Sequence, residues 1–180
     1  MKVGTKSLLF GVHQFLWHPA TVWLAWWKQY YTFPTWRETV CIVIHDWGYF
    51  GQPNMNGVEG ERHPELGAKI AGWLFGPEYH DLCLFHSRHY ARNCSRVPSK
   101  LCWTDKGCVR FDPWWLYLPR AWLSGELDEY RADAARAGLL PIECSHRNWY
   151  AWLSKKFEDM ATGGVVPYMN PERKYESTHK

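Results

Sequence analysis

Signals that start helices recur along the chain and are the strongest constraint on its fold. Thr35 and Glu38 have the spacing of a capping box, and helical periodicity continues from there to Ile44. Pro64 and Pro77 each stand where the first residue of a helix is expected. Convincing strand-like alternation and fixed-period repeats are both missing from the sequence. The sequence therefore predicts an all-α fold, a compact bundle of about seven helices.

The length of 180 residues fits one domain. We expect the helical domain to cover residues 1–163, with extra C-terminal helices over 124–162. The polar stretch 164–180 is expected to form a flexible tail. A formal net charge of +3 is typical of ordinary globular proteins and argues against a polybasic nucleic-acid binder.

The cellular compartment is predicted from the cysteines and from the apolar N-terminal stretch. The six cysteines show no zinc-ribbon spacing, so we interpret them as free thiols in a reducing environment. Polar residues such as His13 and Gln14 interrupt the apolar stretch "SLLFGVHQFLWHPATVWLAWW", which argues against a signal peptide or a membrane anchor. The prediction is a cytoplasmic protein without membrane contact.

A histidine and an aspartate stand at the end of the apolar run "CIVIHDWG", where a predicted helix ends. Other histidines and one aspartate also fall at helix ends or on helix faces. One predicted helix over residues 77–92 carries two histidines three positions apart, on nearly the same side. Mixed imidazole and carboxylate ligands suit Mn, Fe, Co, Ni or Zn. The candidate metal ligands are His18, His45, Asp46, His63, His86 and Asp105, and His89 is the second histidine of the helix pair.

The order of these residues resembles the metal motif of the HD-domain phosphohydrolase superfamily. "HPATVWLAW" is similar to the family's first-histidine helix, "VIHDWG" to its doublet, and "CWTDK" to its distal Asp-Lys pair, over roughly residues 7–123. "ERHPELGAKIAG" and "LFHSRH" resemble the two-metal branch, which includes bacterial dinucleoside tetraphosphate hydrolases. This resemblance implies one metal on His18, His45, Asp46 and Asp105, a second on His63 and His86, and a bridging Asp46.

The resemblance implies hydrolysis of a phosphate ester or anhydride by a metal-activated water. Expected catalytic residues are Asp46, His45, Lys106 and His89. Expected substrate contacts are Arg88, Arg92, Arg62, Tyr49 and Trp47, with arginines on phosphate oxygens and the rings stacked on a base. Tyr49 replaces a lysine often found after the doublet, and "HSRH" replaces the family's "HH" or "HT", so His89 is either a ligand or a substrate contact. The expected partner is a phosphorylated small molecule, a nucleotide or a related compound.

Two other interpretations stay open at this stage. In the first, the chain is a metal- and nucleotide-binding module without turnover. In the second, it is a Trp-rich interaction protein whose histidines are structural. The chain contains 13 tryptophans, and "DPWWLYLPRAWL" is predicted to pack the C-terminal helices or to build a homodimer surface. His13 is predicted to pack against its neighbours, because five positions separate it from His18 and place it on another helical face.

Overall fold

The computed structural model describes residues 1–169, and it describes the side chains of residues 1–160. This part of the chain contains ten α-helices, three short 3-10 helices and no strand, so the all-α prediction is confirmed with more helices than expected. The α-helices are α1 (Val3–Phe10), α2 (Trp17–Tyr30), α3 (Trp36–Ile44), α4 (Pro64–Phe75), α5 (Pro77–Leu84), α6 (Arg88–Asn93), α7 (Lys100–Gly107), α8 (Trp114–Ser124), α9 (Glu126–Arg136) and α10 (His146–Met169). The 3-10 helices are η1 (Trp47–Tyr49), η2 (Gly60–Arg62) and η3 (Cys108–Phe111).

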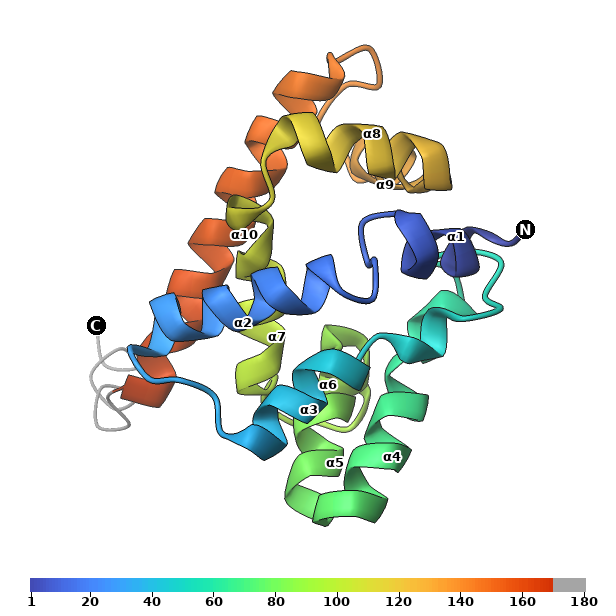
Figure 1. The fold of residues 1–180 in the computed structure, drawn as a ribbon. Helices are drawn as coiled ribbons and strands as arrows, with labels where there is room; N and C mark the ends of the chain where they lie inside the picture. The colour runs from blue at the N-terminus through green and yellow to red at the C-terminus, as the bar shows by residue number, and fades with distance from the viewer. Residues whose placement is uncertain (170–180) are drawn as a thin grey trace.

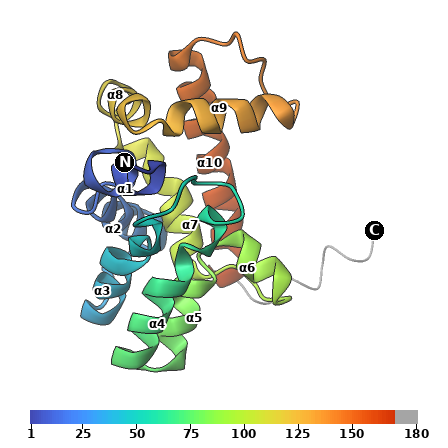
Figure 2. The ribbon, with the colours of Figure 1, turned by 90° about the vertical axis from the view of Figure 1, so that its right-hand side faces the viewer.

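The helices form a body that is spanned by the long helix α10. Figure 1 shows α10 along one side, with α8 and α9 at one end of the molecule and α3 to α6 at the other. Helix α2 crosses between these two ends and packs against α7. Figure 2 shows α9 lying across the upper part of α10, above α7. The site described below lies where these helices approach each other at the middle of the body.

Helix α3 illustrates how the sequence sets the local structure. The side chain of Thr35 accepts a hydrogen bond from the backbone N–H of Glu38 at 3.3 Å, and the Glu38 carboxylate accepts one from the N–H of Thr35 at 2.7 Å. This is the capping box that the sequence predicts. The pair fixes the start of the helix, and Cys41, Ile42 and Ile44 are buried along its length. The last turn of α3 therefore enters the core at a fixed position.

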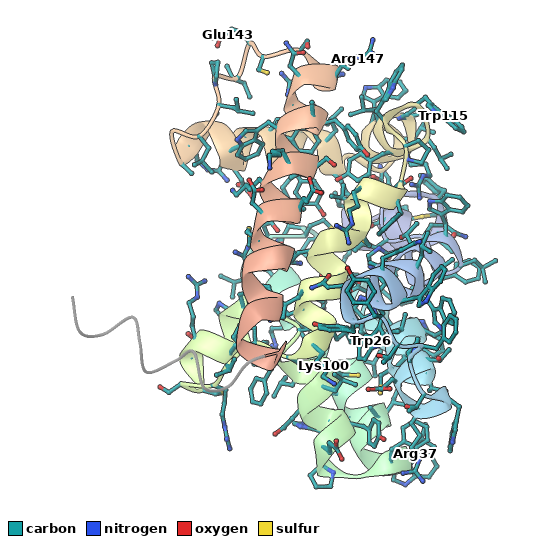
Figure 3. All side chains as sticks on the ribbon, turned by 90° about the vertical axis from the view of Figure 1, so that its left-hand side faces the viewer. Trp26, Arg37, Lys100, Trp115, Glu143 and Arg147 are labelled. Atoms are coloured by element: carbon teal, nitrogen blue, oxygen red, sulfur yellow. The ribbon has the colours of Figure 1, made fainter. Side chains whose placement is uncertain are left out.

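Separate apolar clusters hold the helices that surround the site. The first joins α2, α3 and α7 around Trp26, which is only 2% exposed and is labelled in Figure 3. A second joins α3, α4 and α5 through small residues such as Ala68 and Cys83. A third joins α8, α9 and α10 around Tyr117 and Trp149. Burial of such side chains contributes about 1.5–3 kcal/mol each, so these clusters give the site rigid walls.

The described residues bear on three further predictions, which concern the domain boundary, the cysteines and the apolar N-terminal stretch. Helix α10 continues to Met169, so the expected domain boundary at residue 163 falls inside this helix, while residues 170–180 of the expected tail lie outside the described residues. All six cysteines have free thiols. Each helix in the described residues is too short or too polar to cross a membrane.

Candidate metal centre

Six buried side chains from different parts of the chain meet at the middle of the helical body. One belongs to the first turn of α2, two follow α3, one precedes α4, one lies between α5 and α6, and one is on α7. All of them are at most 8% exposed. They are His18, His45, Asp46, His63, His86 and Asp105, the six ligands that the sequence predicts. Their ligand atoms form two groups that share Asp46.

The first group combines two imidazoles with two carboxylates. The Nε2 atoms of His18 and His45 are 3.3 Å apart. Asp46 Oδ2 lies 3.1 Å from the first and 3.2 Å from the second. Asp105 Oδ1 lies 3.3 Å from His18 Nε2 and 3.9 Å from His45 Nε2. These four ligand atoms therefore lie close together although they come from three separate segments, α2, the residues after α3, and α7.

The second group uses the other carboxylate oxygen of Asp46. Its Oδ1 lies 3.4 Å from His86 Nε2 and 3.7 Å from His63 Nε2. These two imidazole nitrogens are 3.1 Å apart. Because Oδ2 faces the first group and Oδ1 faces the second, the carboxylate of Asp46 stands between them as a bridge.

The hydrogen bonds of the imidazoles show that this cluster fits a cation. His45, His63 and His86 each have Nδ1 within 2.5–2.7 Å of a backbone carbonyl oxygen three residues earlier, so Nδ1 carries a proton, and in the neutral rings of His63 and His86 the Nε2 atom carries a lone pair. Lone pairs on His63 and His86 would then face each other at 3.1 Å. Asp46 Oδ2 is buried and has no hydrogen-bond partner among the described residues. A positive ion between these atoms removes both conflicts.

The distances also fit a transition metal. Metal bonds to histidine nitrogen and carboxylate oxygen are ~2.0–2.2 Å long, so neighbouring ligand atoms of a tetrahedral shell lie ~3.3–3.6 Å apart. The nitrogen–nitrogen and nitrogen–oxygen separations given above, 3.1–3.9 Å, lie close to that range. Histidine ligands commonly donate their other ring N–H to a backbone carbonyl, as three of these do. The buried His/Asp groups can therefore hold metal ions.

Two glycines allow the ligand-bearing segments to come together. A Cβ atom on Gly48 would lie 2.0 Å from the carbonyl oxygen of His63, so only glycine lets η1 rest against the residue that precedes α4. A Cβ on Gly67 would lie 2.7 Å from the carbonyl oxygen of Ile44 and 3.0 Å from Cα of His45. The glycine of the "HDWG" sequence is therefore required by packing, because it lets the segment that carries Asp46 approach His63.

The second ligand group has protonation states that suit metal binding. In the first group burial alone would lower the histidine pKa values, but Asp46 and Asp105 raise the pKa of His45 to about 9, and Cys108 together with these carboxylates raises that of His18. Burial and the neighbouring His86 lower the pKa of His63 well below its usual range, and burial lowers the pKa of His86. Burial alone would raise the carboxyl pKa of Asp46 and of Asp105, but His45 beside the first and Lys106 beside the second hold both well below their usual range. The second group therefore offers neutral imidazoles together with an ionised carboxylate, which are the forms that bind metals.

A cavity of about 360 Å³ opens beside the first group, and some of the predicted substrate contacts line it. His18 and Asp105 form part of its wall, next to Tyr49, Arg88 and Lys106. Lys106 Nζ lies 2.7 Å from Asp105 Oδ2. The ring of Tyr49 stacks on that of His63, with centroids 4.0 Å apart and planes at 8°.

The remaining predicted contacts lie elsewhere in the described structure. Arg62 is exposed and its Nε lies 3.2 Å from a carboxylate oxygen of Glu65. Arg92 bonds to the carbonyl oxygen of Arg88, and the exposed ring of Trp47 is outside the cavity wall. The structure therefore brings Tyr49, Arg88 and Lys106 to the cavity and leaves these others apart from it.

The expectation that His86 and His89 share one helix face is wrong. The predicted helix over 77–92 is divided into α5 and α6, and His86 lies in the break. The carbonyl oxygens there have other partners: Cys83 O accepts from His86 Nδ1, and Phe85 O accepts from the N–H of Ser99 at 2.9 Å. The break turns His86 into the cluster, whereas His89 lies outside both ligand groups and its Nε2 is 2.9 Å from the side chain of Asn93.

His13 is a site residue that the sequence analysis assigned to packing. It precedes α2 in the turn after α1, so helical spacing relative to His18 does not apply. Its Nδ1 lies 2.9 Å from the buried carboxylate of Glu126, and its Nε2 lies 4.0 Å from Asp46 Oδ2. His13 also lines the cavity. Only the polar interruption of an apolar stretch marked this histidine in the sequence.

Comparisons of the chain with protein-family models, with curated proteins and with solved structures gave no match. The likeness to HD-domain phosphohydrolases stays a prediction from the motif. The established features of this site are an all-α scaffold and two groups of buried His/Asp side chains that can hold metal ions.

Proposed function

We propose that this protein is a metal-dependent phosphohydrolase that cleaves a phosphate ester or anhydride of a nucleotide or a related phosphorylated small molecule. One observation carries the proposal: two ligand groups share Asp46 beside a cavity whose wall contains the cations Lys106 and Arg88. Paired metal sites next to positive side chains suit a substrate with phosphoryl oxygens. The ordered motif that resembles the HD-domain superfamily supports the same reaction class.

The six ligands would hold the ions, with His18, His45, Asp46 and Asp105 in one group and Asp46, His63 and His86 in the other. When bound at such a site, divalent transition metals act as Lewis acids toward phosphoryl oxygens and lower the pKa of a coordinated water to about 7. Three backbone carbonyls fix the rings of His45, His63 and His86, so the ligand geometry is set before substrate arrives.

The other side chains of the cavity bind and orient the substrate. Lys106, which is 2.7 Å from Asp105, brings a positive charge next to the first group, and Arg88 adds a second cation. Both neutralise phosphoryl oxygens, and the guanidinium can do so through two hydrogen bonds. Tyr49 stacks on His63 and restricts rotation of its ring. His13 also lines the cavity, with its Nε2 4.0 Å from Asp46 Oδ2, and is a further hydrogen-bonding group.

Phosphate release from a panel of nucleotides and other phosphate esters tests this proposal. The protein is assayed with Mn, Fe, Co, Ni or Zn, beside Asp46→Asn as a blank and His80→Ala as a control. His80 lies outside both ligand groups. We expect metal-dependent release that Asp46→Asn abolishes and His80→Ala retains. Metal and nucleotide binding without release from any compound would instead favour a binding module, and release that survives in Asp46→Asn would refute the site.

A further inference from the structure

The cavity beside the metal centre extends well beyond the space that a phosphate group needs. Its wall includes His18 and Asp105 of the metal centre, and another part of the wall is built by Trp149, Leu153 and Phe157 of α10. The volume is about 360 Å³, within the ~300–1,000 Å³ of small-molecule sites. A cavity of ~150 Å³ accommodates one benzene ring, so this space can receive a group of two rings.

The wall that α10 contributes is largely aromatic, and Lys156 is its one charged member among the lining residues. Val109 and Tyr117 continue the surface that α10 presents, and both belong to the apolar cluster between α8, α9 and α10. The indole N–H of Trp149 is buried and has no hydrogen-bond partner within residues 1–160. The indole nitrogen has almost no accessible surface, so the α10 wall presents mainly the carbon faces of its rings to a ligand. A group rich in hydroxyls would lose hydration against these faces without gaining partners.

Three cations line the cavity. Lys106 stands beside Asp105, Arg88 is a second, and Lys156 of α10 has its ammonium 4.6 Å from the centroid of the Trp152 ring. Two further carboxylates of the wall are already paired, Asp112 with Arg120 and Asp133 with Arg136. A ligand that matches the whole cavity thus combines an anionic group, placed next to His18, Asp105 and Lys106, with a flat apolar body against the aromatic residues of α10.

We infer that the cavity selects phosphate monoesters of flat, mostly apolar ring compounds over monoesters of polyhydroxylated compounds such as sugars. The inference rests on the proposed function for the phosphate end and adds the class of the leaving group. Hydrolysis of such an ester forms a P–O bond from water and breaks the P–O bond to the organic group. The products are inorganic phosphate and the free ring alcohol, which takes up one proton of the water.

The test compares two esters whose leaving groups are both primary alcohols, 2-naphthylmethyl phosphate and glucose 6-phosphate. We expect kcat/KM for the naphthyl ester to exceed that for the sugar ester by about 10- to 100-fold, the effect of burying one large apolar group. Calorimetry with 2-naphthylmethylphosphonate and methylphosphonate, which are not hydrolysed, should show tighter binding of the naphthyl compound by a similar factor.

Two variants test whether the cavity itself causes the preference for the naphthyl compounds. Ala137 is exposed and lines the cavity, so Ala137→Trp fills the space without disturbing the core. Ala151 is exposed on α10 outside the cavity wall, and Ala151→Trp is the matched control. Ala137→Trp should remove both the preference in kcat/KM and the preference in affinity, and Ala151→Trp should keep both.

Equal kcat/KM for the two esters, or a preference that survives in Ala137→Trp, would overturn the inference and leave the proposed function intact. If neither ester nor any nucleotide is hydrolysed, the proposed function fails and the phosphonates decide the inference alone. A naphthyl preference in binding that Ala137→Trp removes would then support the apolar cavity as a ligand site, and equal or undetectable binding of both phosphonates would refute it.

Discussion

Replacing the buried carboxylate of Glu126 by an amide should destabilise the fold by about 3–5 kcal/mol, the range for removing one side of a buried charged network. Glu126 is fully buried at the start of α9. Its Oε2 accepts hydrogen bonds from the N–H of Val12 at 2.9 Å and from Ser124 Oγ at 2.5 Å. Its Oε1 accepts from Ser7 Oγ at 2.7 Å and also lies 2.9 Å from His13 Nδ1.

The size of this destabilisation follows from the amide group of glutamine, which has one acceptor oxygen where the carboxylate has two. Its NH₂ group must face the donors of one of the two oxygens. The backbone N–H of Val12, or the ring of His13 on the other side, then points at another donor. A buried donor left without an acceptor costs about 1–3 kcal/mol, and each hydrogen bond to a charged group contributes about 1.5–3 kcal/mol. For a chain of this length the loss corresponds to a Tm lower by roughly 6–20 °C.

Urea unfolding followed by helical circular dichroism measures this difference, with a chelator present so that metal binding does not contribute. Glu143→Gln is the control, because Glu143 is exposed at the outer end of the loop before α10, as Figure 3 shows. The control should unfold at the same urea concentration as the original chain. Equal midpoints for Glu126→Gln and the original chain would refute the idea that this carboxylate connects the N-terminal turn to α9.

The pH dependence of Glu126→Gln gives an independent check of the same reasoning. Burial alone would raise the pKa of Glu126, but the hydrogen bonds from His13, Ser124 and Val12 lower it below its usual range. The carboxylate therefore stabilises the fold fully above the unfolded-state pKa of ~4.3, and this contribution is lost as the pH falls through the lower folded-state pKa. The difference in unfolding free energy between the two proteins should be constant from about pH 7 to 5 and shrink below about pH 4.

Three further predictions concern the metal centre. His63→Ala should lower the bound metal from two ions to one per chain, because the second group loses a ligand, and His80→Ala should keep both ions in elemental analysis. Gly48→Ala should destabilise the fold by roughly 1–3 kcal/mol or more and lower the metal content, because the added Cβ atom would lie 2.0 Å from the carbonyl oxygen of His63. An unchanged melting temperature would contradict this close approach. Lys106→Met should reduce phosphate release by about 10²-fold at unchanged metal content, whereas the surface variant Lys28→Met should have full activity.

Local sequence signals predicted the elements that depend on local interactions. The capping box at Thr35 and Glu38 and the proline at the start of α4 each set a helix start that the structure contains. The six metal ligands were found because the order of a known motif links residues as distant as His18 and Asp105. Spacing alone would not have joined them, since their meeting depends on how α2, α3 and α7 pack.

The features that sequence reasoning missed depend on contacts between distant segments. Nothing in the helical pattern of residues 77–92 marks a break, because the carbonyl of Phe85 finds its new partner at Ser99, beyond the next helix. Glu126 belongs to a charged segment that reads as exposed, yet the turn after α1 buries it completely. The role of His13 follows from the same turn, so no local pattern shows it.

The shared carboxylate of Asp46 makes the two halves of the centre unequal in their tolerance of change. Substitution of His63 or His86 leaves the four candidate ligands of the first group in place, so a site for a single ion should survive that mutation. Substitution of Asp46 removes a ligand from both groups at once. The robustness of the whole centre to mutation is therefore set by one side chain, whose position depends on the glycine two residues after it.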